Sequence, residues 1–179
     1  MTHKTPKSPE MANNRITERE ALLRLSTLCS QAEHCAHEMT EKMQRWELTE
    51  EEQARVMERL TKDKFIDDER FARVFALDKI RYNKWGRRKV EQALWLKRID
   101  ADIRRRVLDG IDEEEYMAVL RPLLKSKRRS TRAVSSREMT MKLMRFAMGR
   151  GFGMDEIRAC LDCDDDLTDG CGGMDDDGF

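Results

Sequence analysis

Glycine and proline, the two residues that interrupt helices most strongly, are nearly missing from the middle of this chain. Between residues 10 and 148 they occur only at Gly86, Gly110 and Pro122, and the other seven glycines lie at or after Gly149. A sheet protein needs turn residues far more often, and no segment of the sequence alternates polar and apolar residues as a strand does. The sequence therefore predicts an all-α protein whose helices are joined by tight turns.

Several helices are expected to begin where Ser or Thr is followed three residues later by Glu. This pattern occurs at Ser30, Thr49 and Ser135. The hydroxyl can accept a hydrogen bond from a free amide of the first turn while the Glu side chain bonds back to the capping residue. Asp67 and Asp100 are expected to cap two more helices. Apolar residues spaced three and four apart fill the segments between these caps, which predicts nine helices.

The nine predicted helices fall into repeating groups of three. Leu48 and Ile99 are 51 residues apart, as are Val56 and Val107, and a looser third copy places Phe152 53 residues after Ile99. We therefore predict three tandem three-helix repeats that stack into an elongated, curved array. The predicted segments are a flexible N-terminus at 1–14, three-helix repeats at 15–66, 67–112 and 113–161, and a disordered acidic tail at 162–179.

The chain is neutral overall, but its charges are segregated along the sequence. Residues 79–106 hold eleven basic residues against three acidic ones, and residues 121–150 hold ten against one. Residues 162–179 hold eight aspartates and no Lys or Arg. A basic body points to a polyanionic partner. The acidic tail either competes for the same basic surface or serves only to keep the protein soluble.

Two features of the sequence concern the cellular setting. No apolar run approaches the roughly 20 residues that a membrane span needs, and residues 1–10 hold no apolar signal-peptide block. The five cysteines are an odd number in a chain large enough to fold without disulfides. We therefore expect a cytoplasmic protein with no membrane partner and no disulfide framework.

No group of residues in the sequence has the pattern of a catalytic or metal site. The glycines at 149–153 lack the Lys-Ser/Thr pair of a phosphate loop. The Cys-x-x-Cys at 160–163 has no second pair, and no standard zinc spacing relates four residues of the first repeat: Cys29, His34, Cys35 and His37. We expect a protein that is not an enzyme, with no catalytic residues, no metal and no cofactor.

The basic segments remain as the candidate binding surface. Between residues 81 and 89, basic residues alternate with Tyr82 and Trp85, which is typical of surfaces that meet phosphates and stack on bases or on another protein. The alternative is a charged face whose aromatic side chains pack inward. Trp95 lies about 100° from the buried stripe, so it either packs against the adjoining repeat, which we favour, or meets a partner. The predicted partner-binding residues on the basic face are Arg81, Lys84, Trp85, Arg87, Arg88, Lys89, Arg98, Arg104, Arg105, Arg128, Arg129 and Arg132.

Three segments together resemble a known family. They are residues 64–72 (KFIDDERFA), 85–94 (WGRRKVEQAL) and 150–157 (RGFGMDEI), and they resemble the RecX regulatory proteins, modulators of the RecA recombinase. The similarity spans about residues 15–161 and includes the order and number of helices. The family usually has glycine where this chain has Arg98, and often near Glu47, so two helix ends lack the residue that best tolerates a left-handed conformation.

The resemblance implies a non-enzymatic regulator that lies along the groove of a RecA–DNA filament. Such a protein restrains ATP hydrolysis, filament extension and strand exchange, and so affects homologous recombination, DNA repair and the SOS response. The implied partner is the RecA filament, with single- or double-stranded DNA as a further partner of the basic segments, and a monomer is expected. Two alternatives stay open, namely a helical DNA-binding protein that acts on its own and a helical scaffold for another protein.

Overall fold

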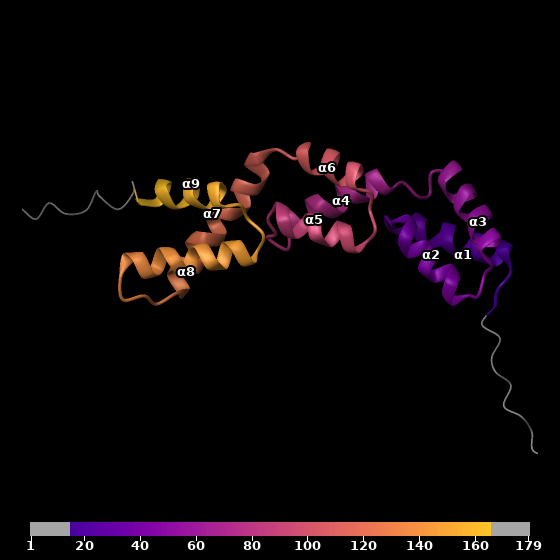
Figure 1. The fold of residues 1–179 in the computed structure, drawn as a ribbon, viewed down its shortest axis with the longest axis horizontal. Helices are drawn as coiled ribbons and strands as arrows, with labels where there is room; N and C mark the ends of the chain where they lie inside the picture. The colour runs from indigo at the N-terminus through magenta and orange to yellow at the C-terminus, as the bar shows by residue number, and fades with distance from the viewer. Residues whose placement is uncertain (1–14, 166–179) are drawn as a thin grey trace, which may run out of the picture. The chain divides into compact units, whose positions relative to one another are not determined.

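The computed structural model describes residues 15–165, and all regular elements in this range are helices (Figure 1). They are α1 (Glu18–Gln31), α2 (Ala36–Arg45), α3 (Glu50–Lys62), α4 (Asp68–Arg81), α5 (Arg87–Leu96), α6 (Ala101–Asp109), α7 (Glu113–Ser130), α8 (Ser136–Gly149) and α9 (Met154–Asp165). The predicted all-α fold with nine helices is confirmed for this range. The flexible N-terminus predicted at 1–14 lies outside it. Of the disordered acidic tail predicted at 162–179, residues 162–165 instead form the end of α9, and residues 166–179 lie outside the described range.

The chain divides into two compact units, one ending at Asp67 and the other beginning at Asp68. In the first unit, α3 packs against both α1 and α2. In the second unit, α4 packs against α5, α6 and α7, while α7 packs against α8 and α9. The second unit therefore holds two groups of three helices in mutual contact. The curvature of a three-repeat array stays a prediction.

Two of the predicted helix caps are formed as expected, and a third is formed in part. The Thr49 hydroxyl accepts from the Glu52 amide at 3.3 Å, and the Glu52 carboxylate accepts from the Thr49 amide at 2.8 Å. Asp100 accepts from two amides in the first turn of α6. Ser135 accepts from the Glu138 amide, but the Glu138 carboxylate bonds to the amide that precedes Ser135. These side chains satisfy amides that have no partner within their helices.

The helix start predicted at Ser30 is wrong. Ser30 lies in the last turn of α1, where its hydroxyl donates to the carbonyl of Ser26 at 2.8 Å. Helix α2 begins only after Cys35, which makes no side-chain capping bond. The capping box of this repeat is formed instead by Thr17 and Glu20 at the start of α1. A serine hydroxyl can bond a carbonyl within a helix as well as an amide at its start, so the pattern alone does not locate a cap.

The threefold repeat is clearest at the ends of α2, α5 and α8. Each of these helices ends in a Schellman motif, in which two amides beyond the helix bond back to carbonyls of its last turn. In every case the second amide belongs to a buried apolar residue, and its nitrogen lies 3.2 Å from the carbonyl oxygen that accepts the bond. These residues are Leu48, Ile99 and Phe152. They are the residues that the sequence aligns at spacings of 51 and 53, so the same backbone device recurs in all three repeats.

A Schellman motif requires a residue with left-handed backbone just after the helix. Gly151 fills this position after α8 with φ of 90°. After α2 and α5 the position is filled by Glu47 and Arg98, with φ of 58° and 59°. The Cβ atom makes this conformation unfavourable for residues other than glycine. These two helix ends, which have Glu and Arg where glycine would fit without a steric cost, are therefore strained.

Replacing Arg98 with glycine should stabilise the protein. We expect Arg98→Gly to raise the free energy of unfolding by about 0.5–1 kcal/mol, because glycine adopts the left-handed conformation without a steric cost. The matched control, Gln92→Gly on the exposed face of α5, should lower it by about 1 kcal/mol. Urea unfolding followed by circular dichroism measures both. An Arg98→Gly protein no more stable than the parent would contradict the left-handed assignment.

The two repeats of the second unit meet backbone to backbone where α5 begins. The Gly86 amide donates to the Arg150 carbonyl at 2.9 Å, and the Arg88 amide donates to the Gly151 carbonyl at 3.1 Å. A Cβ atom on Gly86 would lie 2.3 Å from the backbone nitrogen that follows Gly151. A Cβ atom on Gly151 would lie 2.5 Å from a side-chain carbon of α5. The two backbones can approach this closely only because both positions are glycine. We call this the glycine contact between Gly86 and Gly151.

Adding a single methyl group to the glycine contact should separate the two repeats. We expect Gly86→Ala to lower the free energy of unfolding by about 2 kcal/mol or more, because the new Cβ meets backbone that cannot rotate away. Gly149→Ala is the matched control, since a Cβ there meets nothing within 4 Å; helix propensity should make it neutral or slightly stabilising. Equal unfolding midpoints for the two variants in thermal denaturation would show that the contact is absent.

Candidate partner-binding surface

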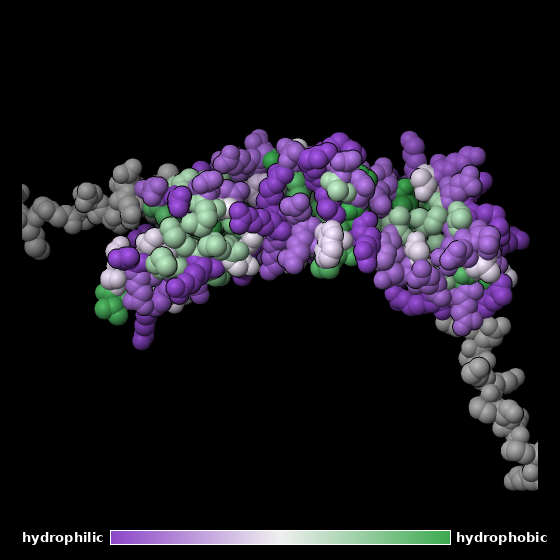
Figure 2. All heavy atoms as spheres, in the orientation of Figure 1, coloured by the Kyte–Doolittle hydropathy of each residue, from purple (hydrophilic) through white to green (hydrophobic). Residues whose placement is uncertain are grey.

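The twelve predicted binding residues all lie in the second unit, and they fall into three groups. The first group is at the junction of α4 and α5, the second surrounds the turn between α5 and α6, and the third is at the end of α7. Figure 2 shows that hydrophilic side chains dominate the visible face over α4, α5 and α6. The hydrogen bonds and ion pairs of each cation show which of them connect helices of the fold. The remaining cations are candidates for contact with another molecule.

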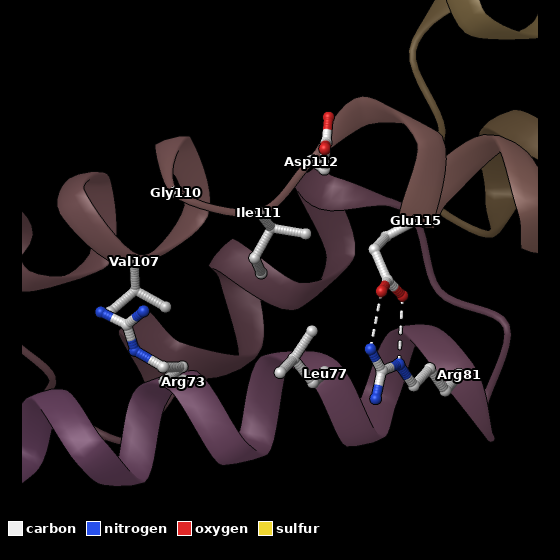
Figure 3. Close-up of a pocket in the computed structure, with 8 residues that line it drawn as sticks. All are labelled: Arg73, Leu77, Arg81, Val107, Gly110, Ile111, Asp112 and Glu115. Atoms are coloured by element: carbon white, nitrogen blue, oxygen red, sulfur yellow. Dashed lines mark hydrogen bonds and ion pairs between the residues drawn. The ribbon is translucent and has the colours of Figure 1, made fainter.

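Arg81 joins α4 to α7 and is not a free surface cation. Its Nε and Nη2 atoms donate to the two carboxylate oxygens of Glu115 at 3.0 and 2.6 Å (Figure 3). These hydrogen bonds hold the pKa of Glu115 below its usual value and raise the pKa of Arg81. The pair borders a pocket of about 260 Å³ that side chains of α4, α6 and α7 line (Figure 3). Arg81 therefore ties the two repeats of the second unit together.

Arg87 joins α5 to α6. Its Nη1 atom donates to the Leu108 carbonyl at 2.7 Å, and its Nη2 atom pairs with the carboxylate of Asp109. Carbonyls in the last turn of a helix have no partner within the helix, and cations are favoured there. Arg87 supplies both the donor and the charge at the end of α6, which is a structural role.

The cations after α5 divide in the same way. The half-buried Arg104 donates to the Ile99 carbonyl at 2.8 Å and so supports the turn before α6. Arg105 pairs with Asp102 at 2.6 Å within one turn of α6, and both side chains are exposed. Exposed pairs of this kind contribute little to stability, so they separate readily. Arg105 can therefore exchange its partner, whereas Arg104 is held in place.

Trp85 is covered by cations and is only partly accessible. The Nζ atoms of Lys89 and Lys79 lie 4.9 and 5.7 Å from the centroid of its ring. A cation over the face of an indole is attracted by the π electrons of the ring. The inward-packing alternative therefore describes the half-buried Trp85 well, whereas Tyr82, three residues earlier, is 78% exposed.

Lys84 and the third group complete the twelve. The Lys84 ammonium donates to a backbone carbonyl at the end of α4, and Arg128 is half-buried near the end of α7. Four other arginines are exposed and make no side-chain hydrogen bond or ion pair with any residue between 15 and 165: Arg88, Arg98, Arg129 and Arg132. These four are the cations best placed to meet an external partner.

The exposed face of α5 brings one of these cations together with apolar side chains. Arg88 and Trp95 are seven residues apart and therefore share a side of the helix, and Trp95 is 55% exposed. The packing of Trp95 against an adjoining repeat, which we favour from the sequence, stays a prediction. Leu96, 63% exposed, adds a second apolar side chain, and Arg98 follows just beyond the helix. The α5 face is defined here as Arg88, Trp95, Leu96 and Arg98.

The α5 face includes two residues that the sequence-based list of binding residues lacks. Trp95 and Leu96 are not among the predicted binding residues, because that prediction rests on basic segments. Both lie off the stripe of Val90 and Leu94, which are fully buried. Large apolar residues outside a helix's buried stripe are the signal that could have identified them.

Residues 15–165 contain neither a group of metal ligands nor a membrane-spanning helix. In that range no three or more His, Cys, Asp or Glu side chains are grouped so that they could hold a metal ion. No helix there is long and apolar enough to cross a membrane.

Comparison with known protein families identifies both repeats of the second unit. Residues 67–108 match the model of the second three-helix domain of RecX, and residues 113–161 match the model of its third three-helix domain. Together the two matches cover half of the chain. The chain belongs to the RecX family of regulatory proteins. Both sides of the Gly86–Gly151 contact and the whole α5 face lie within the matched residues.

Curated RecX proteins are similar over most of this chain. "Regulatory protein RecX" of Oceanobacillus iheyensis is 27% identical over 115 residues, which are 64% of this chain and 42% of that protein. The protein of the same name from Lactobacillus delbrueckii subsp. bulgaricus, strain ATCC BAA-365, is 27% identical over 149 residues, or 81% of this chain and 55% of that protein. The chain thus spans about half the length of the curated relatives that it matches.

Solved RecX structures share the fold. The crystal structure of RecX from Lactobacillus salivarius superimposes with a TM-score of 0.75 at 17% identity, covering 87% of this chain and 99% of that one. A second crystal structure, of a regulatory protein RecX, gives a TM-score of 0.74 at 19% identity and covers 81% and 73% of the two chains. The helical repeat fold predicted from the sequence is therefore that of known RecX structures.

Neighbouring arginines of α5 should respond differently to truncation. We expect Arg87→Ala to lower the free energy of unfolding by about 1 kcal/mol, because a carbonyl at the end of α6 loses its donor. Arg88→Ala, the matched control, should change it by less than about 0.5 kcal/mol, since Arg88 bonds to no described side chain. Chemical denaturation measures both values. Equal losses at the two positions would mean that this division of the cations is incorrect.

Proposed function

We propose that this RecX family protein binds RecA–DNA filaments and modulates RecA. The main effect is inhibition of RecA ATPase, of filament extension and of strand exchange, so that the protein regulates DNA repair, homologous recombination and the SOS response. The proposal assigns no catalytic chemistry to the chain, and it includes a cytoplasmic monomer. Family membership supports RecA as the partner. The observation that carries the binding site is the α5 face, where exposed apolar side chains lie between two arginines that have no partner among the described residues.

The composition of the α5 face suits a protein partner that is itself charged. Trp and Arg are enriched at the centres of protein interfaces, where an aromatic side chain buries a large area and Arg forms directional hydrogen bonds. Arg88 and Arg98 lie on either side of Trp95 and Leu96 along the chain. Such a face can bury its apolar residues against RecA while its arginines meet carboxylates of RecA or phosphates of the DNA.

Binding by a repeat protein explains inhibition without new chemistry. A chain of three-helix repeats can touch successive protomers of a filament, and weak contacts on one chain reinforce each other through effective concentration. A ligand that binds one conformation of the filament better than the others shifts the population toward it. RecA must change conformation during its ATPase cycle, so a protein that holds the filament in one conformation slows that cycle.

Direct DNA binding is the second candidate function, and the charge distribution favours it. Residues 121–150 carry ten basic residues and one acidic residue, and Arg129 and Arg132 are exposed at the end of α7. Binding through many phosphate contacts weakens steeply as salt rises, because counterions are released. Binding to RecA through the α5 face should persist in part at high salt, so a salt titration of DNA and filament binding separates the two functions.

The decisive test of the α5 face is RecA ATPase activity on single-stranded DNA. We expect the parent protein to reduce the rate of ATP hydrolysis and the double variant Arg88→Glu/Arg98→Glu to lose at least about tenfold in inhibitory potency, because both charges reverse at the interface. Neither substitution removes a bond between described side chains, so the circular dichroism of the variant should equal that of the parent.

The control for this test changes net charge by the same amount in the first unit. Arg19→Glu/Lys62→Glu alters two exposed cations, which likewise make no side-chain bond among residues 15–165. It should inhibit RecA as the parent does. Undiminished inhibition by Arg88→Glu/Arg98→Glu would remove the α5 face from the proposal, and equal losses in both variants would show that only net charge matters.

A further inference from the structure

The third repeat brings three helix ends together at one place. Helices α7, α8 and α9 pack against one another in pairs, and short connections reverse the chain between them (Figure 1). The end of α7, the start of α8 and the end of α9 therefore lie at the same end of this repeat, and residues 166–179 leave from that end, after Asp165.

The segment before α8 and the exposed side of α8 are strongly cationic. Arg129, Arg132, Arg137 and Arg145 are exposed, and none of them makes a side-chain hydrogen bond or ion pair within residues 15–165. Glu138 is the only acidic residue between 121 and 150, and it pairs with Lys142 at 2.7 Å. Within residues 121–150, these four arginines therefore have no acidic partner.

A groove lies among these cations on the outer side of α8. Its volume is about 360 Å³, and it is lined by Ser135, Arg137, Glu138, Met141, Lys142 and Arg145. Met141 is 45% exposed and gives the groove an apolar wall. The groove can therefore take a segment that combines negative charge with apolar side chains.

Residues 166–179 have this combination. They contain five aspartates, no Lys, Arg or Glu, and three large apolar residues, Leu167, Met174 and Phe179. Fourteen extended residues reach about 46–50 Å, whereas the 14 residues of α8 are only about 21 Å long. From the end of α9, this segment can reach every point along the groove.

We propose that residues 166–179 bind the α8 groove of their own chain and compete there with polyanionic partners. The groove binds the segment through Arg137, Lys142 and Arg145, with Met141 against its apolar residues. A tethered segment acts at an effective concentration in the millimolar range, so weak contacts suffice. The effect on RecA–DNA filaments rests on the proposed function, whereas the contact within the chain does not.

The contact is tested in the full-length protein by removing the charge of the segment. The tail variant replaces Asp166, Asp169, Asp175, Asp176 and Asp177 with Asn. We expect the backbone amide resonances of residues 135–145 to shift relative to the parent in NMR spectra at about 0.05 M salt, where charges are weakly screened. When Arg137→Ala and Arg145→Ala are added to both the parent and the tail variant, the difference between their spectra should disappear. Without these two arginines the segment does not bind the groove, so removing its charge changes nothing there.

Competition is tested with a fluorescein-labelled single-stranded oligothymidylate as the polyanion. The tail variant should bind this probe about threefold to tenfold more tightly than the parent at low salt. The matched control changes five exposed glutamates of the first unit to Gln, at positions 41, 47, 50, 51 and 58, which alters net charge equally and should have a smaller effect.

Equal tightening in the tail variant and the control, with unchanged amide resonances in α8, would overturn the proposal, because the segment would then act through net charge alone. Neither measurement contains RecA. A protein that fails to inhibit RecA but shows the amide shifts would refute the proposed function and leave the contact intact. A protein that inhibits RecA but shows no amide shifts would refute the contact and leave the proposed function intact.

Discussion

The second unit depends on the contact between Gly86 and Gly151, where the backbones of two repeats meet without side chains between them. Two hydrogen bonds cross this contact, and a methyl group on either glycine would collide with the opposite repeat. Two of the three segments that carry the family resemblance, residues 85–94 and 150–157, meet at this point. The residues of these two segments therefore form the contact between the second and third repeats. This contact fixes where α5 and its exposed face lie relative to the third repeat.

Charge serves two purposes in this unit, and sequence composition alone does not separate them. Arg81, Arg87 and Arg106 join different helices through Glu115, Asp109 and Glu69. Arg88 and Arg98 lie in the same basic stretch of the sequence as Arg81, Arg87 and Arg106, yet they bond to no described side chain. Cations that join elements stabilise the scaffold, whereas Arg88 and Arg98 are exposed and form no bond with a described side chain. Replacing a whole basic run would thus combine a loss of folding with a loss of binding.

The sequence predicted the fold better than the site. Local signals such as the caps at Thr49 and Asp100 led to the helices, and the 51-residue spacing of Leu48 and Ile99 led to their grouping into repeats. The start at Ser30 failed because a serine can bond a helical carbonyl. The role of Arg87 and the exposure of Trp95 depend on residues distant in sequence, among them Asp109, so a pattern along the chain could not reveal them.

The central claim is that this chain recognises the RecA–DNA filament and not DNA alone. Co-sedimentation at about 0.15 M salt, where surface charges act over only about 8 Å, tests it most directly. The account predicts that the protein pellets with RecA filaments assembled on single-stranded DNA and stays in the supernatant with the same DNA in the absence of RecA. A protein that stays in the supernatant in both cases, or pellets equally in both, would contradict it.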